Sequence, residues 1–171
     1  MRERTFKIFV VEDNEWYNKL LMHCLALNPD YEIVSFTNGT DMMKEINQNP
    51  NVITLDYRLP DGTGEEYLRK IKAYNPSINV VIISEQEEIE TAVELLKGGA
   101  YDYIVKTKDI RDRLISTINH IRDNFNLKTQ LNRLQNEIGK KYSFEKTLIG
   151  ESMAIKSTYE LMSKAVGNNI T

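Results

Sequence analysis

Hydrophobic residues in the first two thirds of the chain gather in short runs at regular intervals. Five runs, rich in β-branched and aromatic residues, cover residues 6–11, 31–36, 52–56, 79–84 and 101–105. The segments that follow them, 15–27, 39–47, 64–74, 87–97 and 109–122, repeat apolar residues every three or four positions, as amphipathic helices do. Turn-forming residues separate the segments. The pattern predicts five strands that alternate with five helices.

The strand runs are apolar almost throughout, with no polar residue at every second position. Such runs are typical of parallel strands that are covered by helices on both faces of a sheet. Strands that alternate with helices indicate the α/β class. We therefore expect a flavodoxin-like, doubly wound sheet of five parallel strands, in the order 2-1-3-4-5 when strands are numbered along the chain.

The helical pattern continues beyond residue 122 but changes face. Four apolar residues, Leu127, Leu131, Leu134 and Ile138, follow one another at spacings of 4, 3 and 4. This stripe steps back by one residue, or about 100° around the helix, from the stripe that ends at Ile121. Residues 123–143 are interpreted as a helical linker whose second stripe is a dimer seam. The alternative is a helix that folds back onto its own domain, since the seam covers fewer than two heptads.

The segment 139–144, "GKKYSF", predicts a break in this helix, and residues 152–166 predict a further amphipathic helix.

The stretch "LIGESMAIKS" at 148–157 approaches the phosphate-binding pattern G-x-x-x-x-G-K-[ST], with Gly150, Lys156 and Ser157 in register. Ile155, however, stands where the second glycine is needed. A β-branched residue disfavours the backbone conformations that wrap a phosphate, so no nucleotide site is expected here.

Composition narrows the function classes only slightly. Among 171 residues, 41% are hydrophobic and 27% are charged, and the formal net charge of −3 gives no reason to expect direct nucleic-acid binding. Cys24 is the only cysteine, which excludes an internal disulfide and a site of several cysteines. No apolar run approaches the ~20 residues of a membrane-spanning helix. We expect a soluble, cytoplasmic protein with no membrane contact.

Polar residues stand where the predicted strands end. They are Glu12 and Asp13 after the first strand, Asp56 in the third, Ser84 in the fourth and Lys106 after the fifth. Because parallel strands end at one edge of the sheet, the three carboxylates should converge there, and they repel one another unless a cation joins them. Carboxylate oxygens suit Mg²⁺. A lysine and a hydroxyl at the same edge suit a phosphoryl group, and one carboxylate could act as its nucleophilic acceptor.

Four segments that carry these residues resemble the signature segments of response-regulator receiver domains. They are "VVED" (10–13), "TLDYRLPDGTG" (54–64), "VIIS" (81–84) and "YDYIVK" (101–106), so that a receiver is expected over residues 1–122. The resemblance implies that Asp56 accepts a phosphoryl group from a sensor histidine kinase. It also implies Mg²⁺ held by Glu12, Asp13, Asp56 and the backbone carbonyl of Arg58, phosphoryl binding by Ser84 and Lys106, and Ser84 and Tyr103 as switch residues. Two residues depart from the family pattern: Thr107 stands in place of a usual proline, and Glu85 in place of a small residue.

Residues 144–171 resemble the opening of the AAA+ ATPase domain of NtrC-like, sigma-54-dependent activators. The likeness lies in "LIGESMAIKSTYELM", with no complete nucleotide site. It implies that the chain is the receiver and linker of a larger transcription activator, which contacts sigma-54 RNA polymerase and DNA only through domains absent here. The chain itself is then not an enzyme. A homodimer would form through the linker, or through the surface of the predicted helix 87–97, strand 101–105 and helix 109–122.

Two other classes of function remain open at this stage. The first is an interaction module that uses the receiver fold and linker for dimerisation without phosphorylation. The second is a haloacid-dehalogenase-like phosphohydrolase with Asp56 as nucleophile, which is disfavoured because Tyr57-Arg58 breaks the D-x-D motif of that family.

Overall fold

The computed structural model describes residues 6–151, with side chains as far as Ile138. Residues 1–123 and residues 124–171 form two separate units, which are described individually below. The first unit contains a five-stranded parallel sheet made of β1 (Phe6–Val11), β2 (Tyr31–Phe36), β3 (Val52–Asp56), β6 (Asn79–Ser84) and β7 (Asp102–Val105). The strands lie in the order β2-β1-β3-β6-β7. The predicted fold class and strand order are confirmed.

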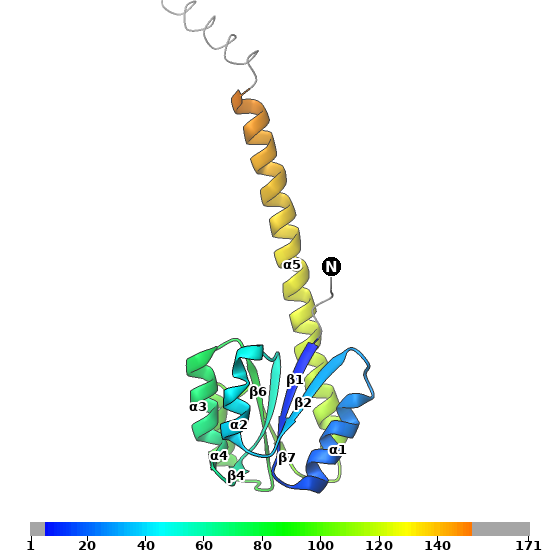
Figure 1. The fold of residues 1–171 in the computed structure, drawn as a ribbon, viewed down its shortest axis with the longest axis vertical. Helices are drawn as coiled ribbons and strands as arrows, with labels where there is room; N and C mark the ends of the chain where they lie inside the picture. The colour runs from blue at the N-terminus through cyan, green and yellow to red at the C-terminus, as the bar shows by residue number, and fades with distance from the viewer. Residues whose placement is uncertain (1–5, 152–171) are drawn as a thin grey trace, which may run out of the picture. The chain divides into compact units, whose positions relative to one another are not determined.

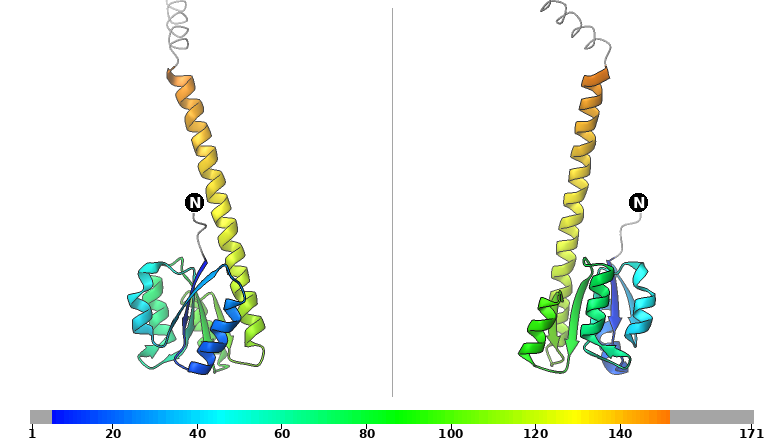
Figure 2. Two further views of the ribbon diagram at one scale, coloured as in Figure 1. Left: turned by 45° about the vertical axis from the view of Figure 1, so that its right-hand side comes forward. Right: turned by 90° about the vertical axis from the view of Figure 1, so that its left-hand side faces the viewer.

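Helices cover both faces of this sheet. They are α1 (Glu15–Ala26), α2 (Gly39–Lys44), α3 (Gly64–Tyr74), α4 (Ile89–Lys97) and α5 (Ile110–Glu151). Figures 1 and 2 show α1 and the first turns of α5 on one face, with α2, α3 and α4 on the other. The two-sided covering explains why the strand runs are apolar throughout.

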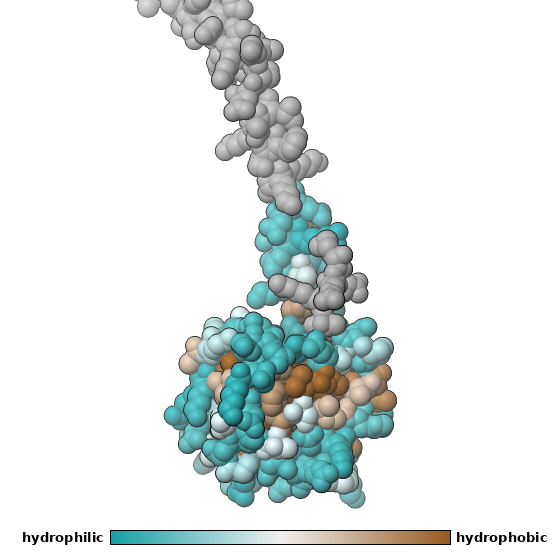
Figure 3. Space-filling model, viewed as in Figure 1, coloured by the Kyte–Doolittle hydropathy of each residue, from teal (hydrophilic) through white to brown (hydrophobic). Residues whose placement is uncertain are grey.

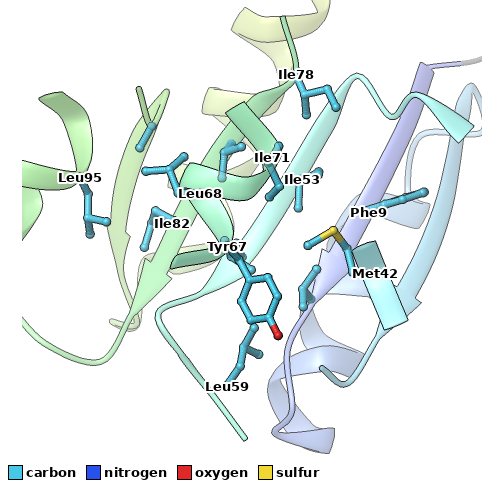
Figure 4. Packing of buried hydrophobic residues seen from close by; sticks show 14 of the residues in the cluster. Phe9, Met42, Ile53, Leu59, Tyr67, Leu68, Ile71, Ile78, Ile82 and Leu95 are labelled. Carbon is cyan, nitrogen blue, oxygen red and sulfur yellow. The ribbon is translucent and has the colours of Figure 1, made fainter. Parts of the chain in front are cut away.

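Buried side chains lie on both faces of the sheet, because successive residues of a strand point to opposite faces. Phe9, Ile53 and Ile82 point toward α2, α3 and α4, where they pack with Met42, Leu68 and Ile71 (Figure 4). The alternate strand residues lie outside that cluster and are also buried, among them Ile8, Val10, Val81 and Ile83. On α5, Ile110, Leu114, Ile118 and Ile121 are buried, as their spacing predicted.

Side-chain caps fix where three of the helices begin. The Asn14 side chain accepts hydrogen bonds from the backbone N–H groups of Trp16 and Tyr17, at 3.0 and 3.2 Å. Asn38 caps α2 in the same way, through the N–H of Asp41 at 2.8 Å. Thr63 and Glu66 form a capping box at the start of α3. The first cap directly follows Glu12 and Asp13, so it fixes the backbone that carries this acidic pair.

A short hairpin after β3 is an element that the sequence analysis did not predict. It pairs β4 (Arg58–Leu59) with β5 (Gly62–Thr63), and Asp61 lies in its turn. Both strands are two residues long, which is too short for a periodicity to be recognised.

Three predicted helix boundaries were wrong. The helix expected over 39–47 ends at Lys44, and a 3₁₀ turn, η1 (Ile46–Gln48), follows and closes on Asn49 in the left-handed conformation with φ 52°. The helix expected from residue 87 begins at Ile89. The break expected at 139–144 is absent, because α5 continues to Glu151. A single glycine, Gly139, costs a helix only about 1 kcal/mol, which flanking helix-forming residues offset. The predicted helix at 152–166 lies outside the described residues.

In the second unit, the four residues of the proposed seam face solvent in the single chain. Leu127 and Leu131 are 59% exposed, and Leu134 and Ile138 are 55% exposed. In the first unit, Figure 3 shows a hydrophobic surface over β1 and β2 within an otherwise polar face. Within residues 6–151, no helix has the length and apolar character needed to cross a membrane.

Candidate functional site

A pocket of about 250 Å³ opens at the carboxyl ends of the strands, where the sequence predicted a site. Its walls come from the ends of β3 and β6, from β4 (Arg58–Leu59), and from the loops after β1, β6 and β7. The lining residues are Glu12, Asp13, Asn14, Asp56, Arg58, Ser84, Glu85, Gln86 and Lys106. All of the predicted site residues except Tyr103 and the seam residues therefore line one pocket.

Three carboxylates meet at the floor of the pocket. Glu12 is fully buried and Asp56 is 6% exposed, whereas Asp13 lies at the exposed rim. One carboxylate oxygen from each of the three lies within 4.8 Å of the others. Parallel pairing of β1 with β3 brings these residues together across more than 40 positions of sequence.

The Lys106 ammonium joins two of these carboxylates. Lys106 Nζ lies 2.9 Å from Asp56 Oδ2 and 3.0 Å from Glu12 Oε1, and its side chain is 2% exposed. Burial works against the charged ammonium, but its hydrogen bonds to Glu12 and Asp56 raise the pKa of Lys106 above its usual value. With all groups ionised, three carboxylates and one ammonium leave two negative charges.

The surroundings of the Glu12 carboxylate favour a positive charge beside it. Its Oε2 atom is buried and accepts no hydrogen bond, although Lys106 Nζ lies 2.9 Å away. Burial and the negative charge of Asp56 raise the pKa of Glu12 to about 7, although the hydrogen bond from Lys106 acts in the opposite direction. A buried oxygen whose near partner is an ammonium shared with Asp56, in a cluster of three hard oxygen donors and two excess negative charges, fits a Mg²⁺ ion.

Ser84 and Tyr103, the two predicted switch residues, both bond to the backbone of Gln86. Ser84 Oγ accepts from the Gln86 N–H at 3.1 Å, and the Tyr103 hydroxyl donates to the Gln86 carbonyl at 2.7 Å. The Tyr103 ring points inward and is 7% exposed, packed against the core on the α4 side. The loop between β6 and α4 thus connects the pocket with Tyr103.

Arg58 and Glu85 line the pocket, and Thr107 directly follows Lys106 in the loop after β7. The Arg58 N–H donates to Asp56 Oδ1 at 3.2 Å, which leaves Oδ2 to Lys106. Glu85 lies at the pocket mouth and is exposed, so the departure noted in the sequence places a fourth carboxylate beside the entrance. Thr107 N–H donates to the Val105 carbonyl at 2.8 Å, a bond that the proline usual at this position could not make.

Sequence reasoning missed two residues that support the site. The Asn18 side chain donates to the Glu12 carbonyl at 2.9 Å, and the Tyr17 ring lies 4.6 Å from Lys106 Nζ. The cap at Asn14 places both residues on the first turns of α1, near the acidic pair. A capping asparagine directly after the acidic pair was the available sequence signal, although it does not reveal which side chains turn inward.

The match to a family model decides the relationship. Residues 8–119 match the model of the response regulator receiver domain. The chain belongs to this family. It is the receiver domain of a two-component response regulator, as the four signature segments predicted.

The most similar relatives include regulators of transcription. The chain is 30% identical to the regulatory protein LuxO of Vibrio cholerae over 140 residues, which cover 81% of this chain and 29% of LuxO. It is 27% identical to the DNA-binding transcriptional regulator NtrC of Proteus hauseri over 138 residues, 80% of this chain and 28% of that protein. The crystal structure of NtrX from Brucella abortus superposes with a TM-score of 0.66 at 30% identity, covering 78% of this chain and 30% of NtrX. The predicted relationship to the NtrC family is confirmed, and this chain spans less than a third of each of these relatives.

Proposed function

We propose that Asp56 accepts a phosphoryl group from the phosphohistidine of a sensor histidine kinase, in a reaction that depends on Mg²⁺. The observation that supports this most strongly is the pairing of Asp56 with Lys106 beside a buried Glu12 oxygen that accepts no hydrogen bond. The one ammonium beside these carboxylates is shared between Glu12 and Asp56, which leaves excess negative charge for a cation to neutralise. Glu12, Asp13, Asp56 and the Arg58 carbonyl would hold the ion, which when bound neutralises charge on the incoming phosphoryl group.

The chain's own residues then perform separate tasks in the transfer. Asp56 Oδ2 attacks phosphorus, the bond from phosphorus to the histidine nitrogen breaks, and an acyl phosphate remains on Asp56. Lys106, already 2.9 Å from Asp56 Oδ2, pairs with a phosphoryl oxygen, and the Ser84 hydroxyl donates to another. These residues receive a phosphoryl group rather than turn over a substrate, so the chain is proposed not to be an enzyme.

The proposed switch runs from Ser84 to Tyr103 through Gln86. Because both side chains bond to the Gln86 backbone, movement of the Ser84 hydroxyl toward a phosphoryl oxygen changes the loop that holds Tyr103. The altered surface consists of α4, β7 and the first turns of α5, where Ile89, Val93 and Leu96 are exposed. We propose that this change is passed to a homodimer, and through it to a cytoplasmic sigma-54-dependent activator.

The phosphorylation proposal is tested with Mg²⁺ and beryllofluoride, a stable mimic of the phosphoryl group, while the fluorescence of Trp16 is followed. Trp16 is 66% exposed, and its ring contacts Tyr17, which in turn lies against Lys106. We expect a saturable change that needs both Mg²⁺ and beryllofluoride and is absent in Asp56→Asn. An unchanged spectrum, together with no gain in intact mass after treatment with acetyl phosphate, would contradict the proposal.

The dimer proposal has its own test in the full chain. Charges introduced on the seam by Leu131→Glu with Leu134→Glu should convert a dimer to a monomer in light scattering. Asn132→Glu with Gln135→Glu, off the seam on the same helix, provides the matched control and should leave the dimer intact. A dimer that survives the seam substitutions would assign the interface to the α4–β7–α5 surface instead.

The alternative function is a receiver-fold interaction module that is never phosphorylated. The exposed seam residues are compatible with this alternative, since dimerisation alone requires no chemistry at Asp56. It predicts that Asp56→Asn leaves every property of the dimer unchanged with acetyl phosphate and Mg²⁺ present.

A further inference from the structure

Tyr17 on α1 contacts the active-site lysine although no sequence motif included it. Its ring lies with the centroid 4.6 Å from Lys106 Nζ, and the side chain is half-buried. The backbone N–H of Tyr17 is held at 3.2 Å by the Asn14 side chain. The first turn of α1 therefore places an aromatic face against the ammonium, next to the loop that carries Glu12 and Asp13.

The Lys106 ammonium has three partners among the described contacts, and only one of them, the Tyr17 ring, is uncharged. The two charged partners are Glu12 and Asp56, with contacts of 2.9 to 3.0 Å. Both are also the groups that would turn toward a bound cation and a phosphoryl group. Once they do, and before a phosphoryl oxygen pairs with the ammonium, the ring of Tyr17 is the one of these three contacts that still holds the ammonium in the pocket. The negative face of an aromatic ring attracts an ammonium, and more strongly where water is excluded.

We propose that Tyr17 is a positioning residue, which holds the Lys106 ammonium over Asp56 when Glu12 engages a cation. This inference rests on the proposed phosphoryl transfer to Asp56. Its consequence is that loss of the ring slows the transfer step, because the ammonium spends less time where the phosphoryl oxygen arrives. Binding of Mg²⁺ by the carboxylates is affected little, since Tyr17 contacts none of them.

The competing explanation is packing alone, because the Tyr17 ring also contacts the Trp16 ring at 5.0 Å. Packing would make the size of the side chain important, whereas positioning makes its aromatic face important. Tyr17→Phe keeps the face and removes the hydroxyl. Tyr17→Leu and Tyr17→Met remove the face but retain apolar side chains, and either of them is informative if the other folds poorly.

The experiment measures, in the full chain, the rate of phosphorylation by phosphoramidate with saturating Mg²⁺, by intact mass. Calorimetry gives the Mg²⁺ affinity, and thermal unfolding gives the stability. We expect Tyr17→Phe to react within about twofold of the wild type, and the Leu and Met variants to react about three- to tenfold more slowly at unchanged Mg²⁺ affinity. Trp16→Leu, which removes the neighbouring ring but no contact with Lys106, is the control and should react at the wild-type rate.

A double-substitution cycle separates positioning from packing. In a Lys106→Met background, Tyr17→Leu should cause no further loss of rate, because the cation that the ring holds is gone. An equal loss with and without Lys106, a wild-type rate in both non-aromatic variants, or a Tyr17→Phe as slow as Tyr17→Leu would each overturn the proposal. If the wild type itself gains no phosphoryl group, the proposed function fails and this inference fails with it, whereas wild-type labelling with equal rates in the variants refutes Tyr17 alone.

Discussion

Two carboxylates in loops that follow strands, Asp61 and Glu12, have opposite surroundings. Asp61 is exposed, yet it accepts hydrogen bonds from the Gly39 N–H, the Thr40 N–H and hydroxyl, and the Tyr67 hydroxyl, at 2.5 to 3.1 Å. Glu12 is fully buried, and its Oε2 atom accepts no hydrogen bond. Asp61, which already has several protein donors, is open to solvent, whereas Glu12 is shielded from it. Asp61 is satisfied by donors within the fold, whereas the surroundings of Glu12 are compatible with the proposed Mg²⁺ site.

The pKa values of the two groups shift in opposite directions, because the balance between burial and hydrogen bonding differs between them. Although desolvation favours the neutral acid, hydrogen bonds from Thr40, Tyr67 and Gly39 lower the pKa of Asp61 well below its usual range. Burial raises the pKa of Glu12 to about 7. Several donors keep the exposed Asp61 ionised, whereas at the buried Glu12 the donor Lys106 is shared with Asp56 and does not offset the cost of burial.

The largest expected effect follows removal of the only ammonium in the described pocket. Lys106→Met leaves Glu12 and Asp56 buried without their cation, so the free energy of unfolding without Mg²⁺ should fall by about 3 kcal/mol. Adding Mg²⁺ should restore part of the loss, because the ion replaces the missing positive charge. Urea unfolding with and without Mg²⁺ measures both quantities. Lys108→Met, at an exposed neighbouring lysine, should change stability little, and a loss of similar size there would contradict the explanation.

A smaller loss is expected at the satisfied carboxylate. Asp61→Ala removes the acceptor for two N–H groups at the start of α2, so the free energy of unfolding should fall by about 1 to 2 kcal/mol. Mg²⁺ should not restore this loss, since Asp61 does not line the pocket. Recovery by Mg²⁺ in the same urea titrations would show that the two sites are not separate.

Asp13→Asn should stabilise the protein in the absence of Mg²⁺. Asp13 lies at the rim within 4.8 Å of the other carboxylates and has no bond to Lys106 among the described contacts. Removing its charge relieves repulsion and should raise the free energy of unfolding by about 0.5 kcal/mol. The same substitution should weaken Mg²⁺ binding several-fold in calorimetry. A destabilised variant with unchanged Mg²⁺ affinity would remove Asp13 from the ligand set.

The two carboxylates should also differ in the pH dependence of stability that they confer. Because the folded-state pKa of Asp61 is lowered, its contribution is present above the unfolded pKa near 4 and is lost as the pH falls below it. The raised pKa of Glu12 acts in the opposite sense, so metal-free protein should lose stability as the pH rises from about 4.5 to about 7. Without Mg²⁺, unfolding curves of the wild type across both pH ranges should show both slopes, whereas Asp61→Asn should lack the acid slope and Glu12→Gln the slope between about pH 4.5 and 7. A Glu12→Gln variant that still loses stability between about pH 4.5 and 7 would contradict the assignment of this slope to Glu12.

The sequence predicted the strands and most of the pocket because local patterns determine them. Each strand is an apolar run ended by polar residues, and parallel order brings Glu12, Asp56, Ser84 and Lys106 to one edge. The contacts that distinguish the two carboxylate sites were not predictable in this way. Asp61 meets Thr40 across 21 positions, through a hairpin too short to show a period. Tyr17 meets Lys106 through the direction of one side chain on α1, which periodicity does not specify.

Helix ends were predicted less well than strands, for a related reason. α2 gives way to the 3₁₀ turn η1, which closes on Asn49 in the left-handed conformation, and the composition of 39–47 does not reveal this change. The passage of α5 through Gly139 reflects the helix-forming residues on either side, which outweigh one unfavourable glycine.

The most direct test of the central claim locates the phosphoryl group within the chain. After reaction with phosphoramidate and Mg²⁺, borohydride reduces an acyl phosphate to an alcohol, which marks the modified carboxylate for peptide mass spectrometry. The account predicts a single mark at Asp56, dependent on Mg²⁺ and absent in Asp56→Asn. A mark at Glu12 or Asp13, or no mark on a protein that binds Mg²⁺, would contradict it.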